Sequence, residues 1–512
     1  MKRILTQNLL RSANRFPERI AFSQNDTDIS YSELVSLSHM LANFLISIGV
    51  NKGDRIGICM NRSIESAYSV YGIMSCGAIY VPIDSRLPEQ RISEILHDCE
   101  ISVIITQNQF GKTIKKIVEG ATIVKHILGL DNLDFEDKQV SSWKSIFSSN
   151  DSTPSTTVQE DDPAYIIYTS GTTGKPKGIV HTHYSGSSYA KLSADLYNVT
   201  HEDILGNHSH LHYDISTMGY LTMPYVGGCT VIVPEAHTIF PVNLAKLIES
   251  KKMTIWYSVP LAIIQLIQTN LLKELNYSSL RWVLFGGEPF DKKYLEQLFG
   301  YIPQAKFSNV YGPAEVNQCT YFNFGSDVSL QNPIPLGTAW PETNLKIDYT
   351  NSDETTGELL VSTSTQMKGY WNQQETTEAS FVTIKDGTNI AKKYYKTGDL
   401  VKQDNDNNLV FLGRKDRQLK VRGYRVELNE IENALLTIDG LEEVAVYPIR
   451  QENGQNAIHS NVVVNDSSLS ENEIRKILVN KLPNQSIPSQ IQIVKTIPRT
   501  GAGKVDYKSL VK

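Results

Sequence analysis

The stretch YIIYTSGTTGKPKGIV, Tyr165–Val180, joins an apolar run to a loop of serine, threonine and glycine that carries lysines. The apolar run is typical of a buried strand. The loop offers backbone N–H groups and hydroxyls, and Lys175 and Lys177 add positive charge, so the segment predicts a site for an anion such as phosphate. It is not a Walker A loop, because Pro176 follows Lys175 where that motif requires serine or threonine. A flexible surface loop of the same composition remains the alternative at this point.

Short apolar runs of the same kind recur along the chain and are separated by longer amphipathic segments. This alternation predicts an α/β protein with parallel or mixed β-sheets covered by helices. The runs cover residues 55–60, 78–84, 101–106, 164–169, 230–234, 254–260 and 281–287.

The 512 residues are too many for one ordinary core, so at least two domains are expected. The pattern changes after the charged segment GRKDRQLKVRGYRVE, Gly413–Glu427, to helix, strand, strand, helix, strand. That order predicts a small α+β domain. We therefore expect a large core domain over residues 1–414 and a C-terminal lid over residues 415–512.

The composition is that of a soluble globular protein, with 40% hydrophobic residues, 20% charged residues and a net charge of −6. The charge suggests no nucleic-acid partner. Five scattered cysteines without a CxxC pair favour buried thiols in a reducing compartment over a zinc site. The first residues do not read as a signal peptide, and no apolar run has the length of a membrane span. A cytoplasmic protein without a membrane partner is expected.

The segment TSGTTGKPKG, Thr169–Gly178, resembles the phosphate-binding signature of adenylate-forming enzymes, which include acyl-CoA synthetases, luciferases and nonribosomal peptide adenylation domains. Other segments resemble further motifs of this superfamily in the expected order, over nearly the whole chain. They are GAIYVPID (77–84), FGGEP (285–289), NVYGPAE (309–315), GELLV (357–361), YKTGDL (395–400), GRKDRQLKVRGYRVE (413–427) and PRTGAGKVD (498–506). The resemblance implies that a carboxylate attacks ATP to give an acyl-adenylate and pyrophosphate, and that a thiol then takes the acyl group.

The resemblance also implies the ATP site. The outer phosphates would lie in the loop, Glu315 would hold Mg²⁺, and Tyr311 would stack on adenine. Asp399 would accept hydrogen bonds from the ribose hydroxyls, with Arg414 beside it. The other implied ATP-binding residues are Thr169, Ser170, Gly171, Thr172, Thr173, Gly174, Lys175, Gly287, Glu288, Asn309, Gly312 and Ala314. The family usually has threonine where Ala314 stands, so one phosphate-facing hydroxyl is absent.

Two further roles are implied for the C-terminal part. Lys504 resembles the catalytic lysine that bridges the carboxylate and the α-phosphate during adenylation. Asp416 resembles the hinge about which the small domain rotates before thioester formation.

The acid is inferred from HSHLHYDISTMGY, His208–Tyr220, where Tyr213–Asp214 matches the aromatic–Asp pair of amino-acid-activating members. Asp214 would bind the α-ammonium group, and a plain acid would leave this carboxylate without a partner. The three histidines of the segment alternate as on a strand and are taken as packing or polar filler. The implied side-chain pocket comprises Ile215, Met218, Tyr257, Leu284, Gly286, Val310, Gln318 and Cys319.

The pocket has no charged residue that could pair with a charged side chain of the substrate, so a small or medium neutral amino acid is expected. The overall arrangement of the chain is similar to that of D-alanine–carrier protein ligases, although these have cysteine where Gly286 stands. No carrier segment follows Lys504, so a separate phosphopantetheinylated carrier protein is the expected acceptor. The alternatives are an acyl-CoA synthetase for an acid without an amino group, with free CoA as the acceptor, and a nucleotide-binding regulator without turnover.

Overall fold

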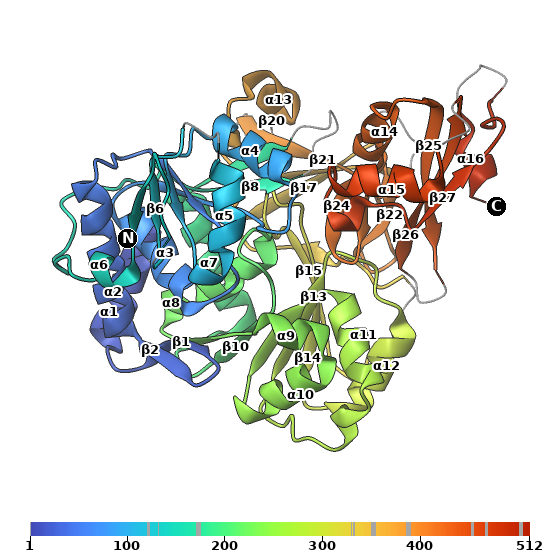
Figure 1. Cartoon of the computed structure of the whole chain (residues 1–512). Coiled ribbons are helices and arrows are strands. Elements are labelled where there is room, and N and C mark those ends of the chain that lie inside the picture. The colour runs from blue at the N-terminus through green and yellow to red at the C-terminus, as the bar shows by residue number, and fades with distance from the viewer. Residues whose placement is uncertain are drawn as a thin grey trace.

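The structure is a computed structural model of the chain (Figure 1). It describes residues 2–119, 123–131, 133–169, 176–328, 330, 333–349, 355–385, 391–451, 455–465, 469–500 and 505–511. Ser170, Gly171, Thr172, Thr173, Gly174 and Lys175 of the predicted phosphate loop, and the predicted catalytic Lys504, lie outside the described residues.

The first large sheet has eight strands in the order β19-β9-β8-β4-β3-β5-β6-β7. Its central and later strands pair in parallel, whereas β8, β9 and β19 pair antiparallel. The strands are β3 (Arg55–Ile58), β4 (Ile79–Pro82), β5 (Val103–Ile105), β6 (His126–Leu128), β7 (Gln139–Ser141), β8 (Pro163–Thr169), β9 (Lys177–Thr182) and β19 (Gly369–Tyr370). The apolar run that opens the predicted phosphate loop is therefore strand β8, as expected.

The second large sheet has nine strands in the order β16-β15-β14-β13-β12-β10-β11-β1-β2, parallel from β1 to β14 and antiparallel at both ends. Its strands are β1 (Ile20–Gln24), β2 (Thr27–Ser30), β10 (Ile204–Asn207), β11 (Cys229–Ile232), β12 (Ile255–Ser258), β13 (Trp282–Gly286), β14 (Lys306–Tyr311), β15 (Thr320–Phe324) and β16 (Thr338–Ala339). Because parallel strands end at the same edge, the loops after β13 and β14 lie side by side.

Helices cover both sheets. They are α1 (Leu5–Arg15), α2 (Tyr31–Ser47), α3 (Ile64–Ser75), α4 (Glu89–Asp98), α5 (Gly111–Val118), α6 (Trp143–Ile146), α7 (His183–Tyr197), α8 (Met223–Val226), α9 (Glu235–Ile239), α10 (Pro241–Ser250), α11 (Pro260–Gln268), α12 (Lys292–Tyr301) and α13 (Gln374–Ala379). Helices α3 and α7 are buried at most positions. Their cores of serine, alanine and glycine allow close packing against neighbouring elements, as expected for helices enclosed on several sides.

Local signals explain where several helices begin. Ser30 and Thr182 form capping boxes at the starts of α2 and α7: each side chain accepts the third helical N–H, and each backbone N–H donates to the side chain of that third residue. Proline occupies the first position of α10 and α11, where no intrahelical N–H partner is lost.

A third, antiparallel sheet follows in the order β17-β18-β21-β20, with β22 paired to β21. Its strands are β17 (Thr343–Asp348), β18 (Gly357–Thr363), β20 (Phe381–Lys385), β21 (Ala391–Gln403) and β22 (Leu409–Arg414). Strands β21 and β22 carry Asp399 and Arg414 as directly opposed partners.

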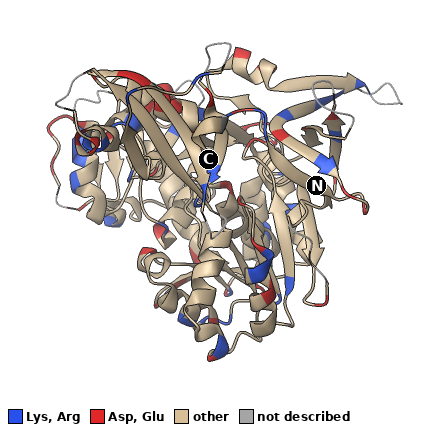
Figure 2. Cartoon of the chain, turned by 90° about the vertical axis from the view of Figure 1, so that its right-hand side faces the viewer, with Lys and Arg blue, Asp and Glu red and all other residues tan. Residues whose placement is uncertain are grey.

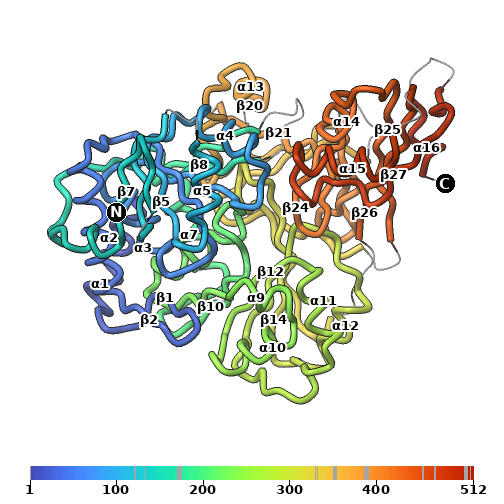
Figure 3. Tube along the Cα trace, in the orientation of Figure 1, coloured from blue at the N-terminus to red at the C-terminus, as the bar shows by residue number. Residues whose placement is uncertain are grey.

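The smaller C-terminal part contains the predicted helix–strand–strand–helix–strand order, so that prediction is confirmed. Its elements are α14 (Leu428–Leu436), β25 (Leu441–Arg450), β26 (Asn456–Val464), α15 (Glu471–Val479), β27 (Gln490–Ile493) and α16 (Tyr507–Leu510). A hairpin of β23 (Gln418–Val421) and β24 (Tyr424–Glu427) precedes them. The trace in Figure 3 places this part at one end of the molecule, away from the N-terminus. The exact boundary at residue 414 stays a prediction.

Basic and acidic residues are interspersed along the ribbon in Figure 2 rather than gathered into a basic stripe. This distribution agrees with the net charge of −6. In the part of the chain that the structure describes, no helix combines the length and apolarity needed to cross a bilayer.

Candidate active site

A cavity of about 770 Å³ lies where the three sheets and the β23–β24 hairpin meet. Most of the residues predicted to bind ATP line it, and they come from strand ends far apart in the sequence. Those that the structure describes on its wall are Thr169, Gly287, Glu288, Asn309, Tyr311, Gly312, Ala314, Asp399 and Arg414. The tertiary fold thus brings the described members of the predicted ATP-binding set to one place.

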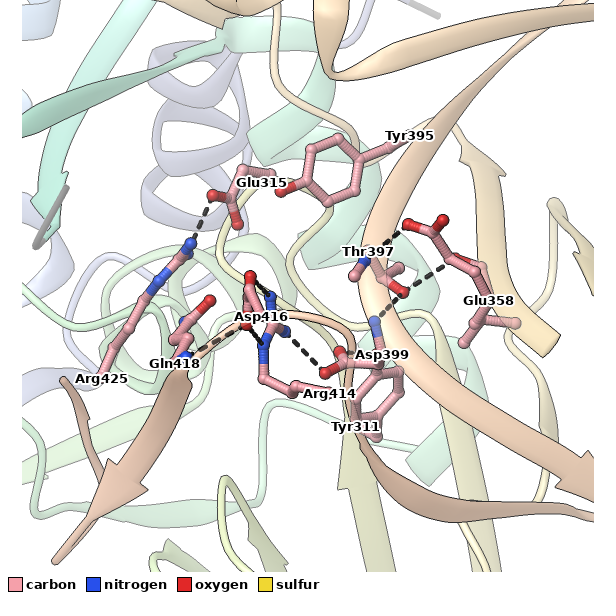
Figure 4. Close-up of polar contacts among 12 residues, drawn as sticks. Tyr311, Glu315, Glu358, Tyr395, Thr397, Asp399, Arg414, Asp416, Gln418 and Arg425 are labelled. Atoms are coloured by element: carbon pink, nitrogen blue, oxygen red, sulfur yellow. Dashed lines mark hydrogen bonds and ion pairs between the residues drawn. The ribbon is translucent and has the colours of Figure 1, made fainter. Parts of the chain in front are cut away.

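Asp399 is the centre of a buried polar network in this cavity (Figure 4). The Tyr311 hydroxyl donates to one carboxylate oxygen, and Arg414 Nη1 lies 2.6 Å from the other. Arg414 also makes a two-pronged ion pair with Asp416, at 2.7 Å from Nε and 2.8 Å from Nη2. Burial raises the pKa of Asp399, and the charge of Arg414 opposes that effect. The network presents oriented polar groups of the kind that can hold a sugar.

The turn that carries Asp399 is itself held in place. The Asp399 N–H donates to Thr397 Oγ1 at 3.0 Å, and the Gly398 N–H donates to Glu358 Oε1 at 2.9 Å. Gly398 has φ of 73°, and a Cβ there would lie 2.7 Å from Arg414 Nη2. Glycine is therefore needed both for the left-handed turn and for the approach of the guanidinium.

Glu315, the predicted metal ligand, follows β14 and is almost completely buried. Its Oε1 accepts from Arg425 Nη1 and from the Tyr370 hydroxyl, each at 2.9 Å. Its Oε2 is buried without a hydrogen-bond partner in the described structure. Burial would raise the pKa of Glu315, but the Arg425 guanidinium outweighs it and lowers the pKa. An ionised carboxylate with one open oxygen fits a hard cation such as Mg²⁺.

Apart from Glu315, the described residues offer few groups that could bind the metal ion or the phosphates. Among the described residues, no group of three or more His, Cys, Asp or Glu side chains is arranged to hold a metal ion. Phosphate oxygens would have to complete the coordination, as is common for Mg²⁺. Thr169 Oγ1, at the end of β8, is buried and makes no hydrogen bond to any described residue. Such an orphaned hydroxyl fits a ligand in the adjoining loop.

Ala314, which stands where the family usually has threonine, contributes through its backbone. His181 Nε2 donates to the Ala314 carbonyl at 2.9 Å. Burial lowers the pKa of His181 to about 4, so the ring is neutral near pH 7. The neutral imidazole thus anchors the backbone beside Glu315 without adding charge.

Asp214 begins the 3₁₀ turn η2 (Asp214–Ser216) and lines both the first cavity and a second one of about 410 Å³. Its Oδ1 accepts the Ile215 N–H at 2.9 Å, and no ion pair within the described residues engages it. Burial raises its pKa, with the positive charge of Lys420 opposing. A partly satisfied carboxylate between two cavities is suited to receive a ligand cation.

The predicted side-chain pocket divides into two groups. Ile215, Tyr257, Val310 and Gln318 line the second cavity beside Asp214, and Gln318 Nε2 donates to the Tyr257 hydroxyl at 2.5 Å. The remaining four line neither cavity; they are Met218, Leu284, Gly286 and Cys319, all buried. A Cβ on Gly286 would lie 2.2 Å from the Val310 carbonyl oxygen, so the backbones approach closely there. Only four of the eight predicted pocket residues are therefore in a position to contact a ligand in the second cavity.

The histidines of the same segment are not on a strand, because β10 ends at Asn207. Nor are they polar filler, as the alternating pattern had suggested. His208 Nδ1 lies 3.1 Å from Ser258 Oγ, His210 Nε2 lies 3.3 Å from Glu235, and His212 Nε2 lies 3.4 Å from Asp84. The chain turns tightly here, and each ring meets a different polar partner.

The β23–β24 hairpin in the cavity was not predicted. Lys420, Gly423, Tyr424 and Arg425 line the cavity wall, and the Gly423 N–H donates to Glu288. The sequence signal was the Arg422–Gly423 pair between alternating strands: both residues have positive φ, 54° and 83°, as in a tight hairpin turn.

The described residues that flank Lys504 in the sequence lie outside both cavities. Arg499 pairs with Val505 in an isolated β-bridge and with Glu443 in an ion pair at 2.9 Å. None of the described residues 490–500 and 505–511 lines either cavity. In this arrangement the hairpin lines the cavity, and the described residues on either side of Lys504 do not.

Comparison with known proteins identifies the class. A model of AMP-binding enzymes matches residues 9–371, and a model of the AMP-binding enzyme C-terminal domain matches residues 430–504. The chain therefore belongs to the AMP-binding enzyme family, and the predicted adenylate-forming resemblance is confirmed.

Two curated relatives match this chain over nearly its whole length. An L-proline–[L-prolyl-carrier protein] ligase of Pseudomonas fluorescens is 29% identical over 519 residues, which cover 100% of this chain and 99% of that protein. Tyrocidine synthase 3 of Brevibacillus parabrevis is 30% identical over 96% of this chain, but the match spans only 7% of the synthase. The chain thus has the length of the first relative and corresponds to one segment of the second.

Solved structures confirm the fold. The Vibrio cholerae adenylation domain AlmE, in complex with glycyl-adenosine-5'-phosphate, superposes with a TM-score of 0.85 at 24% identity, covering 98% of this chain and 96% of that chain. An artificially fused adenylation–PCP di-domain, NpsA-ThdA from Klebsiella oxytoca, gives a TM-score of 0.79 at 22% identity, covering 96% and 94%. The predicted α/β core with a smaller C-terminal domain is confirmed.

Proposed function

We propose that this protein is an ATP-dependent ligase that activates a small or medium neutral amino acid as aminoacyl-AMP. It then transfers the aminoacyl group to the phosphopantetheine thiol of a separate carrier protein. The observation that carries the proposal is Asp214, a carboxylate without a described ion-pair partner that faces the cavity lined by the ATP candidates. The full-length relationship to an amino acid–carrier protein ligase supports the same reading.

In the first half-reaction a substrate carboxylate oxygen attacks the α-phosphorus of ATP, and the bond from that phosphorus to the bridging oxygen breaks. Pyrophosphate leaves with the electron pair. Asp214 would hold the substrate ammonium, and the Asp399–Tyr311–Arg414 network would hold the ribose. Glu315 would hold Mg²⁺, whose charge neutralises phosphate oxygens. Lys504 would contribute a further positive charge at the reacting oxygens.

In the second half-reaction the thiol sulfur attacks the acyl carbonyl carbon. The carbon–oxygen bond to the phosphate breaks, AMP leaves, and the thiol proton passes to solvent. The hairpin borders both cavities, and none of the described residues flanking Lys504 does, an arrangement that suits this half-reaction. Lys504 would therefore have to approach by rotation of residues 415–512 about Asp416.

The proposed function is tested by ATP–pyrophosphate exchange with the proteinogenic L-amino acids, D-alanine, and a panel of aryl and fatty acids. Exchange with one neutral amino acid is the expected result, followed by loading of a phosphopantetheinylated carrier. Exchange only with acids lacking an amino group would instead assign an acyl-CoA synthetase. Nucleotide binding without exchange across the panel would favour the regulator.

Tyr257 should limit the size of the accepted side chain. Tyr257→Ala opens space beside Asp214 and removes the hydrogen bond from Gln318. We expect the ratio of kcat/KM for a larger amino acid to that for the native one to rise by roughly 10–200-fold, the range for about one methylene. Tyr294→Ala, on α12 and outside both cavities, is the control. An unchanged ratio would place the side-chain pocket elsewhere.

The hinge is tested by a pair of variants at one position. Asp416→Asn and Asp416→Pro both remove the carboxylate that pairs with Arg414, but only proline also restricts φ. Relative to the asparagine variant, the proline variant should slow carrier loading after adenylation by about tenfold, or roughly 1.4 kcal/mol of barrier, because residues 415–512 must rotate back about Asp416 before the thiol attacks. Pyrophosphate exchange, which does not need this return, should be equal in the two. Equal transfer rates would argue against a hinge at Asp416.

A further inference from the structure

The β23–β24 hairpin reaches the residue predicted to hold the metal. Arg425 Nη1 on β24 lies 2.9 Å from Glu315 Oε1, and Figure 4 shows the guanidinium pointing at this carboxylate. The Arg425 side chain is 21% exposed and that of Glu315 is 1% exposed. The ion pair joins the C-terminal part of the chain to the loop after β14, 110 residues earlier. Separating the pair would leave the buried Glu315 carboxylate without compensation, so this contact can influence where the hairpin lies.

The carboxylate cannot serve Arg425 and a divalent cation equally. Its Oε1 already accepts from Arg425 and Tyr370, and only Oε2 is open among the described contacts. A divalent ion on the same buried carboxylate would sit close to the guanidinium, and like charges repel strongly when water is excluded. The two cations therefore oppose one another at Glu315.

We propose that Arg425 and the divalent metal compete for Glu315, so that the ion pair holds the hairpin in the cavity only while the metal is absent. This inference rests on the proposed function. Binding of Mg²⁺ with ATP would release the hairpin, and departure of Mg²⁺ with pyrophosphate would let Arg425 return. Arg425 is thus a positioning residue that links the loss of the metal to the arrangement in which the hairpin faces the cavity.

A second acceptor for Arg425 is already in place. Glu427 lies two residues along β24, on the same face of the strand, and its Oε1 is 3.9 Å from Arg425 Nε. When the metal takes Glu315, the guanidinium can keep a carboxylate partner on its own strand. The exchange of partners then leaves no buried charge without compensation, which is the condition for a reversible switch.

The test compares Arg425→Met, which removes the charge, with Arg425→Gln, which keeps hydrogen bonding. Arg422→Met is the matched control, because Arg422 is an exposed arginine at the tip of the same hairpin. One readout is the affinity for Mg²⁺, measured by calorimetry with saturating ATP and without amino acid. The other is hydrogen exchange of the backbone amides of residues 418–427 in the full chain.

We expect the hairpin amides of the native protein to exchange faster with Mg²⁺ and ATP than with ATP and a chelator. In Arg425→Met they should exchange fast without any ligand. Mg²⁺ should bind Arg425→Met about 10–100-fold more tightly, as when a competing state populated at roughly 90–99% is removed. Arg425→Gln should behave similarly, and Arg422→Met should match the native protein.

Unchanged exchange and unchanged Mg²⁺ affinity in both Arg425 variants would overturn the competition. Weaker Mg²⁺ binding in both would also overturn it, since Arg425 would then assist the metal. If no form of the protein binds ATP, the proposed function fails and the inference fails with it. Because amino acid is absent from the assay, an incorrect substrate assignment does not affect the result.

Discussion

Replacing Asp214 with asparagine should lower kcat/KM for amino-acid-dependent ATP–pyrophosphate exchange by about 10²–10³-fold or more. The change leaves the side-chain volume nearly unchanged but removes the charge that faces the substrate ammonium. Loss of one partner of a buried ion pair costs roughly 3–5 kcal/mol, because the remaining charge stays buried without compensation. Initial rates of radioactive pyrophosphate incorporation into ATP, over a range of amino-acid concentrations, measure the effect.

The matched control is Asp195→Asn, which changes an exposed aspartate on α7 that pairs with Lys191. It should leave exchange unaffected. Near-normal exchange in Asp214→Asn would contradict the amino-acid assignment, particularly if acids without an amino group then proved to be substrates.

The pH dependence offers an independent check on Asp214. Burial raises the pKa of its carboxyl, so the substrate-binding carboxylate should be fully present above that raised pKa and lost as the pH falls through it. Because kcat/KM reports groups of the free enzyme, its acid limb should begin at a higher pH than for an ordinary aspartate. Asp214→Asn should lack this limb. If kcat/KM of the native protein stays constant down to the pH range where an ordinary aspartate titrates, Asp214 does not bind the substrate ammonium.

Replacing Lys504 with alanine should reduce adenylation by about 10²–10³-fold, or roughly 2.7–4 kcal/mol, as for loss of one preorganised charge at a transition state. The described cavity walls carry Arg414, Lys420 and Arg425, but no described residue near Lys504. Lys504 is therefore expected to act only in a different arrangement of the C-terminal part. Pyrophosphate exchange measures adenylation, and transfer from supplied aminoacyl-AMP measures the second half-reaction.

The expected pattern is selective: exchange falls in Lys504→Ala while transfer from supplied aminoacyl-AMP and the thermal unfolding midpoint stay near native values. Lys495→Ala, at an exposed position in the same C-terminal segment, is the control. Equal losses in both half-reactions would indicate a general structural role for Lys504 instead of a role in adenylation.

Much of the fold followed from local patterns. The apolar runs at residues 55–60, 78–84 and 254–260 became β3, β4 and β12, because β-branched and aromatic residues in short runs suit strands buried on both faces. The family motifs likewise predicted which strand ends would meet, since β13 and β14 run in parallel and place Gly287 and Tyr311 on one edge. These predictions depend on spacing within short segments.

The sequence by itself therefore determined the fold class, the family and the described ATP candidates that line one cavity. Only the tertiary structure decided that Arg425 lies on Glu315, that Tyr311 and Arg414 both contact Asp399, and that four of the predicted pocket residues lie behind the cavity wall. The physical reason is that strands and turns are specified by neighbours along the chain. The position of the hairpin depends instead on contacts between surfaces that pack separately, and charges more than a hundred residues apart meet only when those surfaces come together.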